Sequence, residues 1–135
     1  MFSLRQRFLA NKLNHCKYEG YSMEIKVDKI EEQVVVSLSG RIDSTAAVEF
    51  EEKLIEIIDA GANKMIIDFL RVQFISSAGL RVLLLAAKKV KPYSGKLVLC
   101  DMSKDVREVF DISGFSTIFD IQENVTKAIS ALKEK

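Results

Sequence analysis

Apolar and polar residues alternate with a period of two at the start of the regular part of the chain, a pattern typical of strands. From Met23 onward, Ile25 and Val27 alternate with charged residues and predict a half-exposed strand. The run Val34–Leu38 is rich in β-branched residues and predicts a second strand that is buried. We expect this strand to end at Gly40.

The spacing of apolar residues then changes to the helical period of about 3.6. Residues 47–58 carry apolar side chains along one face and predict an amphipathic helix. This helix is preceded by Asp43, Ser44 and Thr45, all of residue types that cap helix N-termini. Met65–Ile67 predicts the next buried strand.

The centre of the chain predicts a strand, a loop and a second helix. The strand is expected to end at Asp68, and a loop containing Phe74–Ile75 follows. The helix is predicted over Gly79–Lys91 and is apolar around most of its circumference, so we expect it to lie deep in the protein. Lys96–Cys100 predicts a fourth strand.

The last third of the chain predicts two more helices and one more strand. Ser103 is placed to cap a helix that Gly114 closes, and Ile118–Phe119 marks a short final strand. The inner stripe of the last helix is formed by Val125, Ala128, Ile129 and Leu132. Strands and helices in this order predict an α/β fold: a mostly parallel mixed β-sheet of about five strands with four α-helices.

Residues 1–22 differ from this regular part, so we divide the chain into an N-terminal extension (1–22) and one domain (23–135). The extension mixes apolar residues with Arg and Lys at roughly helical spacing. It fits a flexible or helical arm, or an amphipathic segment that binds a surface. A third interpretation makes Met23 the original start of the protein, because a regular strand begins there.

Composition and charge exclude several classes of function. Lys and Arg number 20 against 19 Asp and Glu, and the two signs are interleaved, which argues against direct binding of nucleic acid. The longest apolar run, Leu80–Ala87, contains Arg81 and is too short to span a membrane. Cys16 and Cys100 form no C-x-x-C pair, and the start lacks the apolar segment of a signal peptide. We therefore expect a cytoplasmic protein without a membrane partner.

Residues for catalysis are missing from the expected domain. The single His is His15, in the extension, so a Ser-His-Asp arrangement within the domain is impossible. There is no spacing of metal ligands, no P-loop and no G-x-G-x-x-G turn. Asp68 resembles the phospho-acceptor of a receiver domain, but the acidic pair and the Lys that such a site requires are absent from the corresponding positions. We expect no enzyme, no cofactor, no metal and no small-molecule substrate.

The remaining candidate is the segment from Asp68 to Leu80, which contains Ser76-Ser77-Ala78-Gly79. Its simplest interpretation is structural: Ser76 or Ser77 caps the helix, and Gly79 allows close packing. The segment also resembles the D-[LF]-x-x-[VL]-x-[FY]-[IM]-[DS]-S-[SAT]-G-L signature of the STAS family, which includes the anti-sigma factor antagonists.

Two further motifs match the same family in order and spacing. Gly40-Arg41-Ile42-Asp43 resembles its Gly-x-[LI]-Asp turn, and Val109–Phe115 resembles its [LV]-F-x-[LMI]-[ST]-G-[LF] segment. The resemblance covers about residues 23–133. It implies the STAS fold and the function of an anti-sigma factor antagonist, which in its unphosphorylated form binds an anti-sigma factor of the serine kinase type and so releases a sigma factor or similar regulator.

The resemblance also implies which residues carry the switch. The kinase phosphorylates the serine that maps to Ser77, and a PP2C-type phosphatase restores it. Well-known antagonists have Asp where this chain has Ser76, which makes Ser76 the alternative acceptor. The implied partner surface consists of Asp43, Ser44, Ser76, Ser77, Ala78, Gly79 and Arg81. An alternative that remains open is a STAS scaffold or signalling-complex subunit that is not regulated by phosphorylation.

Overall fold

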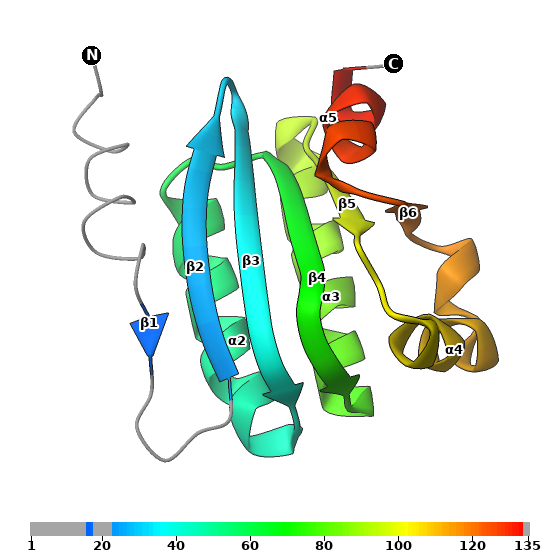
Figure 1. Ribbon diagram of the computed structural model, residues 1–135. Helices are drawn as coiled ribbons and strands as arrows, with labels where there is room; N and C mark the ends of the chain where they lie inside the picture. Colours follow the sequence, from blue (N-terminus) through cyan, green and yellow to red (C-terminus); the bar gives the residue numbers. More distant parts are fainter. Residues whose placement is uncertain (1–15, 18–22, 134–135) are drawn as a thin grey trace.

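A six-stranded mixed β-sheet organises the protein, whose structure is a computed structural model that describes residues 16–17 and 23–133 (Figure 1). The strands are β1 (Cys16–Lys17), β2 (Met23–Ile30), β3 (Gln33–Ile42), β4 (Lys64–Ile75), β5 (Lys96–Cys100) and β6 (Asp120–Gln122). They lie side by side in sequence order. β3 to β6 run parallel to one another, whereas β2 is antiparallel to β3 and β1 is antiparallel to β2.

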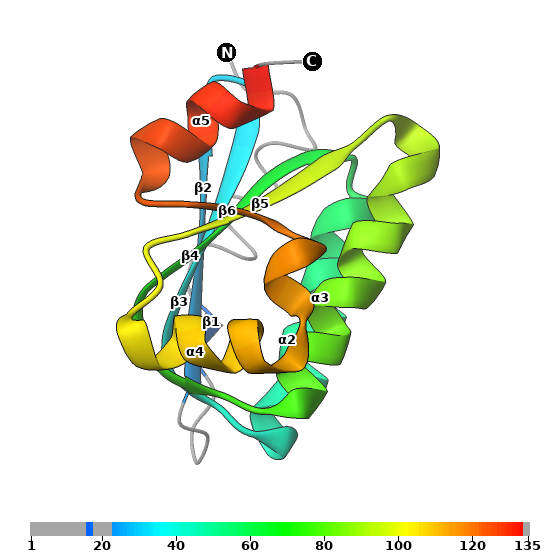
Figure 2. The same cartoon turned by 90° about the vertical axis from the view of Figure 1, so that its right-hand side faces the viewer.

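Helices cover both faces of the sheet, and Figure 2 shows this arrangement from the side. The α-helices are α2 (Ser44–Asp59), α3 (Ser77–Val90), α4 (Lys104–Ser113) and α5 (Val125–Lys133), and two 3-10 helices are η2 (Lys91–Tyr93) and η3 (Phe115–Thr117). α2 and α3 lie side by side against one face, and α5 lies on the other. From Met23 onward the sheet has five strands, and the fold predicted from the sequence is confirmed.

The two faces of the sheet have separate cores because the sheet itself lies between them, and the core on the side of α2 and α3 is the larger. The main core lies beneath α2, α3 and α4 and includes the fully buried rings of Phe50, Phe69 and Phe110. The smaller core joins alternate residues of three strands to Ala128 and Leu132 of α5. The three strand residues in register across that core are Val35, Ile66 and Val98.

β2 and β3 confirm what their sequence patterns predict. Along β2, Met23, Ile25 and Val27 are buried, and the charged residues between them are exposed. In β3, Val34, Val35 and Val36 are all buried because both faces of this part of the strand are covered. β3 continues past Gly40, which has φ of +99°, and ends at Ile42. The expected end of this strand was therefore two residues early.

The prediction that the strand ends at Asp68 and a loop follows is wrong, because β4 continues as a strand to Ile75. Its register with β3 shifts twice: Ser37 pairs with Asp68 but Ser39 pairs with Arg71, and the step after Gly40 again takes one extra residue of β4. Each shift is a β-bulge, at which β4 has one residue more than β3. After each bulge, the positions of β4 that face the core are therefore displaced by one residue. As a result the buried residues of this half of β4 are Phe69, Val72 and Ile75, three positions apart.

The last strand also lies two residues beyond its predicted position. Phe119 is buried instead against Phe110, with ring centroids 6.2 Å apart and an interplanar angle of 76°. Ile118, the other residue assigned to the strand, is 57% exposed. The chain joins the sheet at Asp120, opposite Val98 of β5. Phe119 is apolar because it packs on Phe110, and this apolar position was interpreted as part of a buried strand.

The part of the proposed N-terminal extension that the structure describes is the short strand β1. Cys16 and Lys17 pair with Ile25 and Glu24 of β2, so this short strand extends the sheet beyond the five that were predicted. The other residues of the range 1–22 lie outside the described part of the chain. Among the described residues, no helix combines the length and the apolarity that crossing a membrane requires.

Candidate functional site

The candidate site lies where α2 and α3 begin, at the edge of the sheet that is formed by the carboxyl ends of β3 and β4. Ile42 and Ile75 are the last paired residues of the parallel strands β3 and β4. Each is followed by one capping residue and then by a helix, with Asp43 preceding α2 and Ser76 preceding α3. Because the two strands end together, both helix N-termini lie at this edge (Figure 1). We call the residues Asp43, Ser44, Ser76, Ser77, Ala78, Gly79 and Arg81 the helix-start site.

Both capping side chains are engaged with their own helices. Oδ1 of Asp43 accepts a hydrogen bond of 2.8 Å from the backbone amide of Ala46. Oγ of Ser76 accepts one of 3.2 Å from the amide of Gly79. Each bond satisfies a helical amide that has no partner within the helix. Asp43 and Ser76 therefore have structural roles, and both are partly buried.

Ser77 differs from Ser76 in its exposure and in its contacts. It is the first residue of α3, and its side chain is exposed. Within residues 23–133 its hydroxyl makes no hydrogen bond. The amides of Ser77 and Ala78 are in the first turn, where a helix offers unpaired N–H groups and the positive end of its dipole. The sequence left the choice of cap open, and the structure assigns the cap to Ser76.

Gly79 is required by the close approach of α3 to the ends of the strands. A Cβ atom at this position would lie 2.8 Å from Cγ1 of Ile75 and 3.0 Å from Cγ2 of Ile42. Both distances are shorter than an ordinary van der Waals contact. The glycine thus brings the first turn of α3 against the last residue pair of β3 and β4. The expectation of close packing at Gly79 is confirmed.

A groove of about 320 Å³ runs between α2 and α3 beside the helix-start site. Its walls are formed by Ser44, Ala47, Val48, Glu51, Ala78, Arg81, Val82 and Leu85. Val48 and Leu85 are 58% and 39% exposed, so two large apolar side chains line an open surface. Three members of the helix-start site, Ser44, Ala78 and Arg81, are thereby joined to one continuous surface.

The groove corrects the expectation that α3 lies deep in the protein. Its buried residues include Leu80, Leu83 and Ala86, but Leu85 and Arg81 face outward. Sequence reasoning therefore missed Val48 and Leu85 as surface residues. Their signal in the sequence is weak, because an apolar residue on a helix flank looks the same whether it meets the core or a groove.

Arg41 and Phe74 form a second feature that the sequence did not reveal. The two residues face each other across β3 and β4, one pair before the strands end. The guanidinium carbon of Arg41 lies 4.5 Å from the centre of the Phe74 ring, a cation–π geometry. This contact places a positive charge near the helix-start site, and its position depends on the second bulge of β4.

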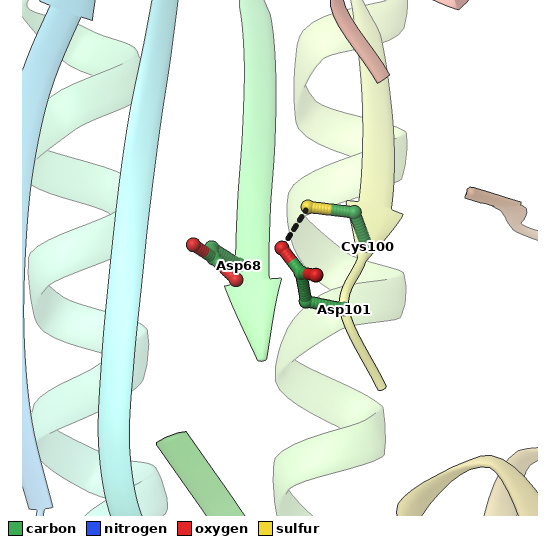
Figure 3. A group of neighbouring side chains, drawn as sticks. All are labelled: Asp68, Cys100 and Asp101. Atoms are coloured by element: carbon green, nitrogen blue, oxygen red, sulfur yellow. Dashed lines mark hydrogen bonds between the residues drawn. The ribbon is translucent and has the colours of Figure 1, made fainter. Parts of the chain in front are cut away.

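A cluster of metal-ligand type lies elsewhere, where β4 pairs with β5 (Figure 3). The ligand atoms of Asp68, Cys100 and Asp101 lie within 4.8 Å of one another. Cys100 Sγ donates a weak hydrogen bond of 3.7 Å to Asp101 Oδ2. Burial, with the nearby Asp68 and Asp101, raises the pKa of the Cys100 thiol, which disfavours the thiolate that binds metals. The sequence missed the cluster because Asp68 is far from the other two along the chain.

The carboxyl group of Asp68 is itself perturbed. Burial, reinforced by Asp101, raises the pKa of Asp68 from 3.8 to about 6. Its Oδ1 also accepts a hydrogen bond of 3.0 Å from the amide of Leu70, at the first bulge of β4. The side chain thus supports an irregular part of the strand.

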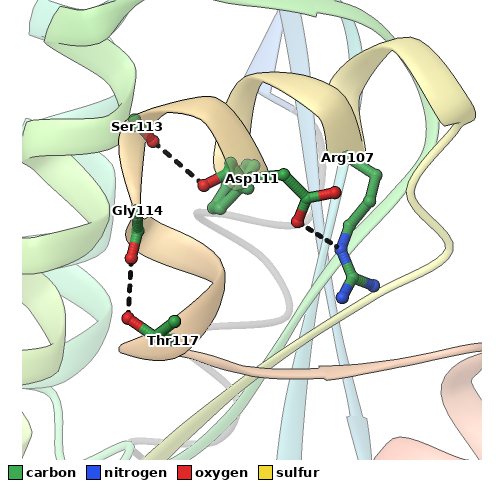
Figure 4. A network of polar contacts seen from close by, with 6 residues as sticks. Arg107, Asp111, Ser113, Gly114 and Thr117 are labelled. Atoms are coloured by element: carbon green, nitrogen blue, oxygen red, sulfur yellow. Dashed lines mark hydrogen bonds and ion pairs between the residues drawn. The ribbon is translucent and has the colours of Figure 1, made fainter.

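The third sequence motif, Val109–Phe115, lies at the end of α4 (Figure 4), and none of its residues lines the groove. Gly114 ends the helix with φ of +83°, a conformation that favours glycine. Its carbonyl accepts a hydrogen bond of 2.8 Å from the Thr117 hydroxyl, and the Phe110 carbonyl accepts one of 3.1 Å from Ser113. Arg107 pairs with Asp111 at 3.2 Å on the same helix. The contacts give this motif a structural role.

Comparison with known proteins agrees with the motifs and the fold. Residues 24–128 match the STAS domain. BtrV of Bordetella bronchiseptica, which is assigned to the anti-sigma factor antagonists, is 40% identical over 111 residues, covering 82% of this chain and 96% of BtrV. The anti-sigma-B factor antagonist of Bacillus subtilis is 32% identical over 100 residues, covering 74% and 91% of the two chains.

Solved structures share the fold at lower identity. SpoIIAA, an anti-sigma factor antagonist from Bacillus, is 23% identical and matches with a TM-score of 0.70 in its unphosphorylated form and 0.62 in its phosphorylated form. The match covers 81% of this chain and 96% or 99% of SpoIIAA. With the family match over most of its length, the chain belongs to the STAS domain family.

Proposed function

We propose that this protein is an anti-sigma factor antagonist that works by partner switching. In its unphosphorylated form it binds an anti-sigma factor of the serine kinase type and thereby releases a sigma factor or a similar regulator. The names of BtrV and the anti-sigma-B factor antagonist, at 40% and 32% identity, support this class of function. In this role the protein is the substrate of a kinase and has no catalytic activity of its own.

Ser77 is the phosphorylated residue in this proposal, and the division of labour between two serines carries the argument. Ser76 uses its hydroxyl to cap α3, whereas Ser77 is exposed and makes no hydrogen bond within residues 23–133. A kinase can reach the Ser77 hydroxyl without breaking the cap. That the same fold has been solved in SpoIIAA with and without phosphate is consistent with a modified residue on such a domain.

The proposed binding surface is the helix-start site together with the adjoining groove. Its apolar side chains, Val48 and Leu85, offer contact area, and its polar residues lie at one end. Phosphorylation would add about 1.5 to 2 negative charges at Ser77. A charge that is buried without a partner, or that faces a like charge across an interface, lowers the binding free energy by roughly 2–5 kcal/mol. The partner's affinity would then fall by at least about thirtyfold.

The direct test is to treat the protein with a serine kinase anti-sigma factor and ATP and to map the phosphate by mass spectrometry. We expect one phosphate on Ser77, none on Ser77→Ala, and its removal by a PP2C-type phosphatase. Ser76→Ala is the matched control and should still be modified. Ser77→Ala should bind the anti-sigma factor whether or not ATP is present, and Ser77→Asp should bind weakly.

Two other results would change the proposal. A phosphate on Ser76 would move the switch by one residue and leave its principle intact. No phosphate at either serine, with binding unchanged by ATP, would favour a STAS scaffold or a subunit of a signalling complex that phosphorylation does not regulate.

A further inference from the structure

Arg81 is a cation that the described part of the protein leaves unpaired. It is exposed on α3 and forms part of the groove wall. None of the ion pairs between described residues involves it, although Lys53 of α2 and Lys89 of α3 do form such pairs. Glu51 lines the same groove from α2, yet the two residues form no ion pair.

Arg81 follows Ser77 by four residues on the same helix. Residues at this spacing lie one turn apart on one face, within reach of each other's side chains. The order also matters, because an acidic group placed N-terminal to a basic one pairs better than the reverse. Ser76 precedes Arg81 by five residues and does not share this face. The helix therefore presents Arg81 to Ser77 and to no neighbouring hydroxyl of the motif.

We propose that Arg81 binds the phosphate of phosphorylated Ser77 and is thereby withdrawn from the groove. This regulation rests on the proposed function, since it requires Ser77 to carry the phosphate. The phosphate would lie between the unpaired amides at the start of α3 and the guanidinium of Arg81, which is suited to bidentate contacts with phosphate oxygens.

The consequence is a second change at the partner surface. In the unmodified protein the groove has a positive group on its α3 wall and Glu51 on its α2 wall. Once Arg81 pairs with the phosphate, the cation is no longer available to an acidic group of the partner, and Glu51 remains. Phosphorylation thus acts on the groove through Arg81 as well as through the new charge at its end.

The test places phosphoserine at position 77 of the full chain by genetic encoding, without any kinase, and follows the phosphate by ³¹P NMR during a pH titration. A free phosphoserine has a second pKa of about 6. We compare the phosphorylated parent protein with Arg81→Gln and with Lys88→Gln. Lys88 is the matched control because it is exposed on the same helix but lies about 16 Å further along the axis from residue 77.

We expect the phosphate of the parent protein to titrate about half a pH unit lower than that of Arg81→Gln, and Lys88→Gln to behave like the parent. The difference should shrink in about 1 M salt. Asp43 and Arg41 at the end of β3 and Glu51 in the groove are the same in all three proteins. The NMR signal of the Arg81 side-chain Nε–H group should also move when residue 77 carries phosphate.

Equal titration midpoints for the parent and Arg81→Gln, with circular dichroism showing both folded, would overturn the proposal. Arg81→Lys, which keeps the charge, should retain a low midpoint, and a midpoint equal to that of Arg81→Gln would likewise contradict a charge-based pairing. Because the phosphate is installed without a kinase, these results are independent of whether a kinase modifies Ser77.

Discussion

The backbone amide of Ser76 donates a hydrogen bond of 2.9 Å to the carbonyl oxygen of Ile42, the residue before Asp43. This bond continues the pairing of β3 with β4 by one step beyond Ile75. It ties the cap of α3 to the end of the strand that leads into α2. The two helix starts are therefore held by the sheet, and the Ser77 hydroxyl is presented on a rigid support rather than on a free loop.

Substitution of the two serines should separate stability from regulation. Ser76→Ala removes the hydrogen bond to the Gly79 amide, so we expect a loss of about 1 kcal/mol in the free energy of unfolding. Ser77→Ala removes no hydrogen bond between described residues and should change it by less than about 0.5 kcal/mol. Urea denaturation of both variants measures the difference, and equal losses would contradict the assignment of Ser76 as the cap.

Gly79→Ala should be destabilising, although alanine is the better helix former by about 1 kcal/mol. The new methyl group would lie 2.8 Å from Cγ1 of Ile75 and 3.0 Å from Cγ2 of Ile42, both in the core. Such overpacking costs roughly 1–3 kcal/mol. A lowered melting temperature with unchanged circular dichroism is the expected result. An increase in stability would mean that α3 can move away from the strand ends at little cost.

Asp68 should make the protein less stable as the pH rises from about 4 to about 6. Its pKa is about 6 in the folded protein against 3.8 for an ordinary Asp, so within this window the folded state binds more protons than the unfolded state. The favourable contribution is complete below pH 3.8 and is lost as the pH passes through 6. At neutral pH the ionised Asp68 therefore lowers stability.

The Asp68→Asn variant isolates this effect from those of other carboxyl groups. Its amide oxygen can still accept the hydrogen bond from Leu70, but it does not titrate. We expect the stability difference between variant and parent to grow in favour of the variant between pH 4 and 6, measured by urea denaturation at several pH values. A difference that stays constant with pH would contradict the raised pKa.

The sequence predicted an element most accurately where its apolar residues keep a single period from end to end. β2 alternates strictly and α2 keeps its helical spacing from Ala47 to Ile58, so both were located within a few residues. The prediction for β4 ended too early, at Asp68. The two bulges of this strand place its buried residues three positions apart, a spacing that suggests neither a regular strand nor a helix. The pairing that creates the bulges involves β3, which is remote in sequence and invisible to a local pattern.

The site was predicted in part for the same reason. The residues at the helix starts follow from two of the three sequence motifs, Gly40–Asp43 and Asp68–Leu80, and the structure brings Asp43 and Ser76 to one edge. The groove and the cluster of Asp68 with Cys100 arise from contacts between elements. Val48 on α2 and Leu85 on α3 have no sequence feature that marks them as neighbours, because their proximity depends on how the two helices pack.

A chain that begins at Met23 should fold with nearly the stability of the full chain. The removed part contributes one described element, β1, whose two residues pair with Glu24 and Ile25 at the edge of the sheet. Among the described residues, those of the main core begin at Met23. We expect a cooperative transition with a melting temperature within a few degrees of the parent. A fall of many degrees would show that residues 1–22 contribute to the core and are not a separate extension.

Phosphorylation of Ser77 should change binding without remodelling the domain. The residue stands at the N-terminus of α3, where unpaired amides and the helix dipole favour an anion by about 0.3–1 kcal/mol at an exposed position. The Asp43 carboxylate at the start of α2 opposes part of this gain by repulsion, although its Oδ1 is already engaged with the Ala46 amide. The net effect on stability should be neutral or slightly favourable.

The rest of α3 gives the phosphate little to displace. Leu80 and Leu83 are buried in the main core, and Gly79 lies close to Ile75, so the helix has no free space between it and the sheet. Packed interiors resist small displacements, which confines the response to the surface. We expect similar melting temperatures for the two forms and amide NMR shifts limited to the helix-start site and the groove. Shifts that spread through β3 and β4, or a large loss of stability, would instead require a switch that works by changing the conformation of the sheet.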